Sequence, residues 1–313
     1  RKIATGRHMK RKGVSNMKRI NKCIELLEQN QIIFALTAQE LTYECGLEMS
    51  QTWADLIQYD FEHHPFDTDG LAKFMKGLKD GGPTPSGHAT PTVITTVPSN
   101  CMTVDEVRYN AWQFRHVLST GIHGILHTHA RQADAVATFV AASRYVFQTI
   151  GRDKGLPEGL RGGGGQKYPA DIWGIDPVEY MNIADPWPLN PKGEIMLGLK
   201  IEDKYCLPDA DNIAAVPGLS FYEWGPGDMG MSHGDPDSHD PPYNDEMNRA
   251  KDIVKSAGDK SGLTFLSSWN DSSMTDEEQA KHLINEENAR ILHVSDPEIA
   301  NQIREEMGRK MPW

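Results

Sequence analysis

Two acidic residues, Glu202 and Asp228, stand at the ends of two short apolar segments of the sequence. Each segment is typical of a β-strand, and residues 209–216 between them are typical of a short helix that ends at Pro217-Gly218. A strand–helix–strand unit of this length makes the strands parallel, so their carboxyl ends open on the same side. We therefore expect the two carboxylates to meet, either as metal ligands or as an acid–base pair.

Eight segments have the composition of β-strands, and helical patterns separate most of them. The strands are expected over 32–36, 56–61, 92–97, 124–127, 194–202, 219–225, 263–268 and 290–294, and the other helices over 21–29, 38–49, 69–79, 103–120, 132–150, 276–287 and 296–309. This order predicts a (β/α)8 TIM barrel rather than an open doubly wound sheet, since no G-x-G-x-x-G turn follows the first strand. We expect one barrel domain over 31–313, preceded by a basic arm and helix over 1–30.

The carboxyl ends of barrel strands share one mouth, where catalytic side chains gather. The residues expected there are Asp60, Glu62, His63, Thr96, His127, His129, Lys200, Glu202 and Asp228. Two carboxylates suit Mg²⁺ or Mn²⁺, whereas a zinc site would need His127 or His129 beside them. His63 follows Asp60 closely enough for the carboxylate to orient it as a general base, and a histidine merely satisfied at a strand end is the alternative.

Two long connections, 151–193 and 226–244, are rich in glycine, proline and other turn-forming residues. Loops of this length are usually lids, binding loops or disordered segments. The run of four glycines at 162–165 suits a lid hinge better than a phosphate loop, because no Lys-Ser/Thr pair follows it. The acidic loop at 235–240 lacks the spacing of a calcium loop, so we expect it to be solvated.

The overall composition excludes several classes of protein. A net charge of −12 argues against a nucleic-acid partner, and no segment has the ~20 apolar residues of a membrane helix. The four cysteines are scattered without a C-x-x-C pair, which is typical of reduced thiols in a cytoplasmic protein.

Several ordered motifs resemble those of the HpcH/HpaI aldolases, which are metal-dependent enzymes that cleave 4-hydroxy-2-oxo acids. The resemblance covers the chain from about residue 32 to the last helix, least well over 151–193. Its motifs are Asp60-Phe61-Glu62-His63 (D-x-E-H), Ala133-Asp134, Arg144-Tyr145, Gly159-Leu160-Arg161-Gly162 (G-x-R-G), Ile201-Glu202, Ala215-Val216-Pro217-Gly218 and Gly225-Pro226-Gly227-Asp228 (G-P-x-D).

The resemblance implies a barrel whose last helix is exchanged between the subunits of a homo-oligomer. It implies that Glu202 and Asp228 bind Mg²⁺ or Mn²⁺, and that His63, paired with Asp60, is the acid–base residue. A pyruvate carboxylate would lie on the backbone amides near Gly227. The expected substrate-binding residues are Gly225, Pro226, Gly227, Thr96, His127, His129 and Arg161, and the partners are a 2-oxo acid and an aldehyde.

The chain departs from the family pattern at two positions in the mouth. Thr96 replaces an arginine that steadies the enolate oxygen, and Lys200 replaces a glutamine two residues before the metal glutamate. Residues two apart on a strand share a face, so Lys200 should enter the mouth beside Glu202. Lys200 either takes over the role of the missing arginine or only pairs with a neighbouring carboxylate.

Three functions follow from these observations. The first is an aldolase-type carbon–carbon lyase that acts through a pyruvate enolate. The second is a different enolate reaction, such as decarboxylation or C–C bond formation, and the third is a catalytically silent assembly subunit.

Overall fold

The computed structural model describes residues 19–313. The basic arm expected over 1–19 therefore lies outside the described residues, except for Arg19. Within 19–313 no helix is long and apolar enough to cross a membrane. The four cysteines, Cys23, Cys45, Cys101 and Cys206, are free thiols.

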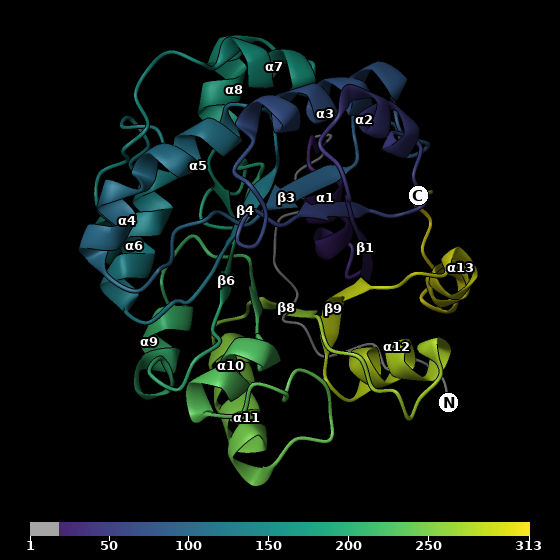
Figure 1. The fold of residues 1–313 in the computed structure, drawn as a ribbon. Helices are drawn as coiled ribbons and strands as arrows, with labels where there is room; N and C mark the ends of the chain where they lie inside the picture. Colours follow the sequence, from purple (N-terminus) through teal and green to yellow (C-terminus); the bar gives the residue numbers. More distant parts are fainter. Residues whose placement is uncertain (1–18) are drawn as a thin grey trace.

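Eight parallel strands form a closed barrel, which confirms the expected fold (Figure 1). Their order around the ring is β1, β2, β3, β4, β6, β7, β8 and β9, and the pairing of β4 with β6 closes it. Their bounds are Ile33–Thr37 (β1), Leu56–Tyr59 (β2), Thr92–Thr95 (β3), Gly124–His127 (β4), Ile195–Lys200 (β6), Phe221–Glu223 (β7), Thr264–Ser267 (β8) and Ala289–His293 (β9). The two-residue strand β5, Pro186–Trp187, pairs only with the start of β6.

Helices surround this ring of strands (Figure 1). Their bounds are Tyr43–Met49 (α2), Thr68–Gly81 (α3), Val104–Tyr109 (α4), Ala111–Leu118 (α5), Ala133–Ala142 (α6), Lys167–Trp173 (α7), Pro177–Ile183 (α8), Ala210–Ala214 (α9), Pro226–His233 (α10), Asp245–Lys260 (α11), Asp276–Asn285 (α12) and Pro297–Glu306 (α13). Apolar residues at helical spacing, such as Leu71, Phe74 and Leu78 on α3, face the barrel and are buried. Local signals fix several starts; Thr275 and Glu278, for example, form a capping box at α12.

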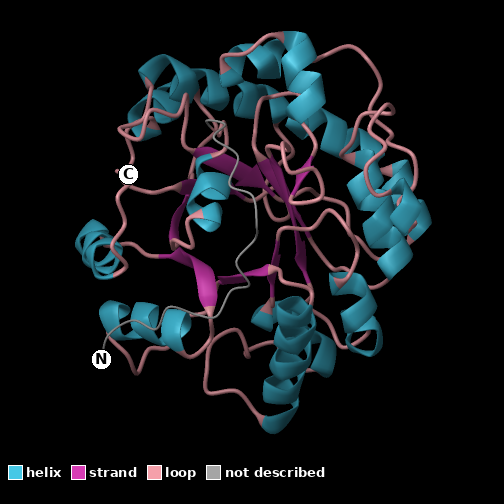
Figure 2. Ribbon diagram, turned by 180° about the vertical axis from the view of Figure 1, so that it is seen from behind, coloured by secondary structure: helices cyan, strands magenta, loops and turns pink. Residues whose placement is uncertain are grey.

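The helix α1 (Lys22–Glu28) closes the amino-terminal end of the barrel. Its buried residues Cys23, Ile24 and Leu26 pack with side chains that point into the barrel, among them Ile33 and Phe221. Seen from behind, this short helix lies over the ring of strands (Figure 2). The side chain of Asn21 caps α1 by accepting hydrogen bonds from the backbone N–H groups of Cys23 and Ile24. The open end of the barrel is thus the carboxyl end of the strands.

The helical layer differs from the sequence-based expectation in four places. The helix expected over 103–120 is two helices, because Asn110 ends α4 and α5 starts anew. The helix expected over 132–150 ends at Ala142, and the segment expected as a loop after β7 contains α10. The sequence-based expectation also omitted α11, whose many charged residues leave only a narrow apolar stripe.

The insertion at 151–193 contains α7, α8 and β5 and lies away from the mouth. It joins the end of α6 to the start of β6, and both of these lie toward the closed end of the barrel. The indole N–H of Trp173 donates to the carbonyl of Gly121, just before β4, and its ring stacks on His123. This segment is therefore not positioned to act as the lid that its composition suggested.

The last helix, α13, packs on the barrel of its own chain. Arg304 donates hydrogen bonds to the carbonyl of Trp53 at 2.6 Å and to the carboxylate of Asp55 at 3.3 Å. An exchange of α13 between subunits stays a prediction from the resemblance.

Candidate metal centre

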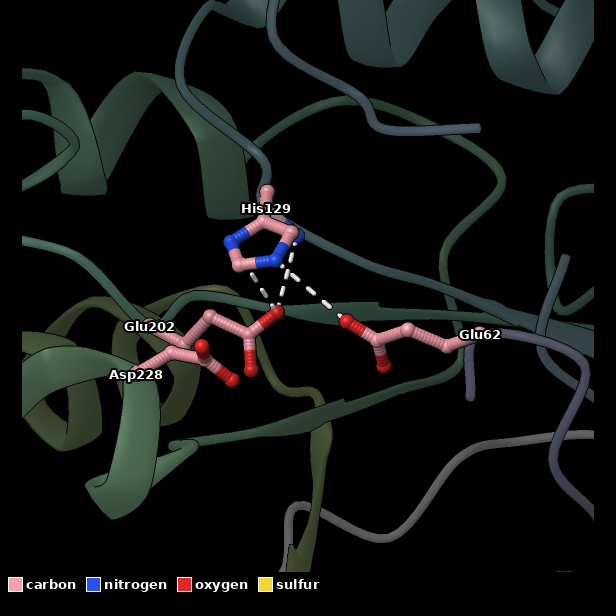
Figure 3. Close-up of side chains that lie close together, drawn as sticks. All are labelled: Glu62, His129, Glu202 and Asp228. Atoms are coloured by element: carbon pink, nitrogen blue, oxygen red, sulfur yellow. Dashed lines mark hydrogen bonds and ion pairs between the residues drawn. The ribbon is translucent and has the colours of Figure 1, made fainter. Parts of the chain in front are cut away.

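Four side chains from different strand ends converge at the open end of the barrel. Glu62 follows β2, His129 follows β4, Glu202 follows β6, and Asp228 lies in the first turn of α10 after β7. One potential ligand atom of each lies within 4.8 Å of the others. Figure 3 shows the four side chains pointing toward one another. The expected meeting of Glu202 and Asp228 is thus what the structure shows, with two further donors beside them.

Glu202 is the most deeply buried of these groups, with its side chain fully shielded from solvent. Its Oε1 atom accepts the backbone N–H of His129 at 2.9 Å, while Oε2 has no hydrogen-bond partner in the described chain. Burial raises the pKa of this carboxyl to about 8, against the opposing charges of Lys200 and His129. Glycine at position 225 makes room for it, because a Cβ there would lie 2.2 Å from Oε2.

His129 joins the cluster through an unusual backbone conformation. Its φ of +50° lies in the left-handed region, which non-glycine residues adopt mainly in turns and at functional sites. The ring then lies between two carboxylates, with Nε2 3.3 Å from Glu62 and Nδ1 3.6 Å from Glu202. The interaction with Glu62 raises the pKa of His129.

Lys200 enters the mouth as expected and forms an ion pair with Glu62. Its Nζ lies 2.9 Å from Oε2 of Glu62 and 4.0 Å from Oε2 of Glu202. Burial opposes the charge, but Glu223, Glu202 and Glu62 together outweigh it and raise the pKa of Lys200. The lysine is therefore a fixed cation among carboxylates.

A second group of contacts organises the loop after β2. The hydroxyl of Thr96 accepts the backbone N–H groups of Phe61 and Glu62 and donates to Oδ1 of Asp60 at 2.7 Å. The other oxygen of Asp60 lies 2.7 Å from Nδ1 of His63. Burial would raise the pKa of Asp60, but the bonds from Thr96 and His63 lower it. Thr96, expected to bind substrate, is buried and instead positions the Asp60–His63 pair.

Two of the expected site residues lie outside this cluster. His127 points outward between Phe114 and Phe139, its Nε2 bonded to the carbonyl of Ser99. Burial lowers its pKa to about 3, so it is a neutral core residue. Arg161 lies beyond the end of α6, where its guanidinium stacks on Tyr145 and donates hydrogen bonds to two tyrosine hydroxyls.

Two residues of the site have positions or roles that the sequence-based expectation did not assign. Glu62 was recognised as a mouth residue but not as a metal ligand, although its ligand atoms belong both to the main cluster and to a second one with Asp60 and His63. Glu223 is buried and lies in register with Lys200 on the neighbouring strand. Side chains two apart on a strand share a face, and Phe221 points into the barrel. The alternation of side chains along β7 therefore predicts that Glu223 also points inward, and this was the signal that could have identified it.

The chemistry of the cluster suits a divalent cation. Glu202 carries a buried oxygen without a partner, and three carboxylates and one imidazole surround a common point. Carboxylate oxygens are the preferred ligands of Mg²⁺ and Mn²⁺, and imidazole nitrogen also binds Mn²⁺ and other transition metals. The residues present thus fit a metal that the protein would hold by Glu202 and Asp228.

Comparisons with solved structures identify proteins of the same fold. No model of a known family and no curated sequence matches this chain. An HpcH/HpaI aldolase/citrate lyase family protein from Burkholderia cenocepacia is 17% identical, covers 92% of this chain and 98% of its own, and has a TM-score of 0.66. An HpcH/HpaI aldolase from Desulfitobacterium hafniense is 18% identical over 92% of this chain and 95% of its own, with a TM-score of 0.63.

Macrophomate synthase is also similar, at 15% identity over 93% of this chain and 87% of its own, with a TM-score of 0.62. At these levels of identity, the likeness shows a shared fold. It agrees with the fold implied by the sequence motifs.

Proposed function

We propose that this protein is a divalent-metal-dependent carbon–carbon lyase that cleaves or forms a 4-hydroxy-2-oxo acid through the enolate of its 2-oxo acid half. The observation that carries the proposal is the convergence of Glu62, His129, Glu202 and Asp228 around a point next to an Asp–His pair and a lysine. The similar structures, an HpcH/HpaI aldolase/citrate lyase family protein and an HpcH/HpaI aldolase, support the same class.

Glu202 and Asp228 would hold Mg²⁺ or Mn²⁺, with Glu62 and His129 beside them. When bound, such a cation would supply Lewis-acid stabilisation of the negative charge that develops on a 2-oxo acid as its C–C bond breaks. The burial of Glu202 keeps water away from this point and strengthens the electrostatic interactions there.

The residues of the chain supply binding and proton transfer. The backbone N–H groups at Gly227 and Asp228 lie in the first turn of α10, where the helix dipole favours a substrate carboxylate. Asp60 accepts the Nδ1–H of His63, which leaves Nε2 free to take the proton of the C4 hydroxyl. Loss of that proton lets the C3–C4 bond break and releases the aldehyde half.

Lys200 would offset the negative charge that forms on the enolate in place of the absent arginine. Its position 2.9 Å from Glu62 supports a charge role in the mouth. Lys200→Gln and Lys200→Ala should each lower kcat for cleavage by about 10²-fold, the size expected for loss of one group that stabilises developing charge. Unchanged turnover in both variants would assign the lysine to pairing with Glu62 alone.

The decisive experiment measures the reaction in both directions. Purified protein, freed of metal and then given Mg²⁺ or Mn²⁺, is incubated with pyruvate and a panel of aldehydes, and with 4-hydroxy-2-oxo acids for cleavage. We expect metal-dependent turnover that disappears in Glu202→Gln and persists in Glu44→Gln, an exposed control on α2. Failure with every acceptor and every hydroxy-oxo acid would exclude the proposal.

A further inference from the structure

A second histidine–aspartate pair lies on the other side of the same mouth. The Nδ1 atom of His239 lies 2.7 Å from Oδ1 of Asp240, the same separation as between His63 and Asp60. The ring has no other hydrogen bond within the described part of the chain, so its Nε2 is free. The loop was expected to be solvated, and the side chain of His239 is indeed 57% exposed.

The ring of His239 packs over the proposed substrate-binding turn. A Cβ added to Gly227 would lie 3.3 Å from Cδ2 of His239, the ring carbon bonded to Nε2. Burial raises the pKa of Glu223, and Lys200, a hydrogen bond with Ser268 and, last, the charge of His239 act against this rise. The Cδ2 edge of the ring therefore lies beside Gly227, the residue that precedes Asp228.

Contacts with the barrel hold this loop in place. The backbone N–H of Asn270 donates to the same oxygen of Asp240 at 3.0 Å, and the hydroxyl of Tyr243 donates to the carbonyl of His239 at 2.8 Å. The ring of Tyr243 packs edge-on against Trp224, with centroids 5.2 Å apart. The position of His239 is thus determined by several independent interactions.

The two pairs belong to opposite walls of the barrel. His63 follows β2, and His239 lies in the connection after β7. In the closed ring, three strands separate β2 from β7 in either direction, namely β3, β4 and β6 on one side and β1, β9 and β8 on the other. A substrate bound at the metal cluster would lie between the two imidazoles.

We propose that His239, oriented by Asp240, is a second acid–base residue that exchanges a proton with C3 of the 2-oxo acid, while His63 serves the C4 hydroxyl. This inference rests on the proposed function. Cleavage needs two proton transfers: His63 takes the hydroxyl proton as the C3–C4 bond breaks and its electron pair forms the enolate. Protonated His239 then gives its Nε2 proton to C3, which becomes the methyl group of pyruvate. His63 releases the hydroxyl proton to water and His239 takes a proton from water, which restores both residues.

The exchange of pyruvate methyl protons in D2O isolates the second transfer, since it needs no aldehyde. We expect the Mg²⁺ enzyme to incorporate deuterium into pyruvate, which proton NMR measures as the loss of the methyl signal. His239→Gln should slow this incorporation by about 10²-fold, the usual contribution of one acid–base group. Glutamine keeps a hydrogen-bonding group but cannot carry a proton at neutral pH. The dissociation constant of pyruvate, measured by calorimetry, should stay within about twofold of wild type. His116→Gln, an exposed histidine on α5, is the matched control.

The pattern across variants distinguishes the alternatives. His63→Gln should slow cleavage at least about tenfold more than it slows exchange, and His239→Gln should do the reverse. If His239→Gln exchanges pyruvate protons at the wild-type rate, the inference is wrong and the proposed function stands. The same holds if the variant loses exchange and pyruvate binding to an equal extent. If the wild-type enzyme neither exchanges nor cleaves, the proposed function fails, and this inference fails with it.

Discussion

The two ends of the barrel each contain a deeply buried carboxylate, but they compensate its charge in different ways. At the closed end, Asp55 lies 3.0 Å from Lys22, 2.6 Å from Arg309 and 3.3 Å from Arg304. Burial would raise the pKa of Asp55, but these cations lower it well below its usual range. At the open end, Lys200 lies 4.0 Å and the His129 ring 3.6 Å from Glu202, one of whose oxygens has no hydrogen-bond partner in the described chain, and burial raises the pKa of Glu202 to about 8.

This difference separates a structural carboxylate from a functional one. A buried charge that the protein compensates fully stabilises the fold only while its partners remain. A buried carboxylate that is compensated incompletely costs stability, and a bound cation removes that cost. The two ends should therefore respond in opposite ways to the same chemical change.

Asp55→Asn should have the largest effect on stability. The substitution leaves Lys22, Arg304 and Arg309 close together without an anion, and breaking a buried ion pair from one side costs about 3–5 kcal/mol. The free energy of unfolding, measured in urea, should fall by this amount, while the exposed control Asp237→Asn should match wild type. A loss below about 1 kcal/mol would mean that the network at the closed end contributes little.

Glu202→Gln should weaken metal binding without lowering the stability of the metal-free protein, which is the opposite of the effect expected for Asp55→Asn. The variant should bind Mn²⁺ at least about 100-fold more weakly. Even the loss of a residue that only hydrogen-bonds to a metal ligand lowers metal affinity by up to about 100-fold. Without metal it should be as stable as wild type or more stable, because the amide removes a buried group with an unfavourable charge. Metal titration and urea unfolding of the metal-free protein provide the two measurements. A destabilised metal-free variant would contradict the comparison.

Two neutral histidines on either end of β4 should make the protein sensitive to acid. Burial lowers the pKa of His123 and of His127 to about 3, whereas each binds a proton near pH 6.5 when unfolded. Because the unfolded chain then binds more protons, stability should fall as the pH drops from about 6.5 toward 3, by about 1.4 kcal/mol per pH unit for each histidine. His127→Phe should reduce this slope by about half the histidine contribution, measured by urea unfolding between pH 7 and 5.

The smallest effect is expected from adding one methyl group beside the metal cluster. A Cβ on Gly225 would lie 2.2 Å from Glu202, whereas one on Gly227 would meet only His239, at 3.3 Å. Overpacking of this kind costs about 1–3 kcal/mol, so Gly225→Ala should weaken Mn²⁺ binding about tenfold or more. Gly227→Ala should bind Mn²⁺ within about twofold of wild type. Equal affinities in the two variants would show that Glu202 moves aside freely.

Much of the fold could be predicted from the sequence, because the strands carry strong local signals. The run 92–97 is β-branched throughout and is followed by Pro98, and the run 194–202 has an apolar centre at 195–199. The same argument brought Glu202, Asp228 and Lys200 to one mouth, since the ends of barrel strands share it. Helix ends were harder to predict, because α4 and α6 end at Asn110 and Ser143 rather than at glycine or proline. The side chains of these two residues donate to the carbonyls of Glu106 and Phe139 in the last turn of the same helix.

The sequence did not reveal which of two nearby histidines points into the mouth, because that depends on the direction in which the backbone turns after β4. His127 and His129 are two residues apart and were expected to share the mouth. The strand ends at His127, and the left-handed backbone of His129 turns the second ring into the site while the first stays in the outer core. The sequence alone did not reveal that turn, because a positive φ is uncommon for residues other than glycine, histidine included.

The ion pairs of Asp55 also have a consequence for biosynthesis. Arg309 follows Asp55 by 254 residues, and β1 pairs with β9 across a similar separation. At about 5–20 residues per second, the ribosome needs on the order of ten seconds or more to supply these partners. During that interval the nascent chain exposes the unpaired edge of β1 and a carboxylate with only Lys22 beside it. We expect the growing chain to depend on chaperones until α13 and Arg309 have emerged.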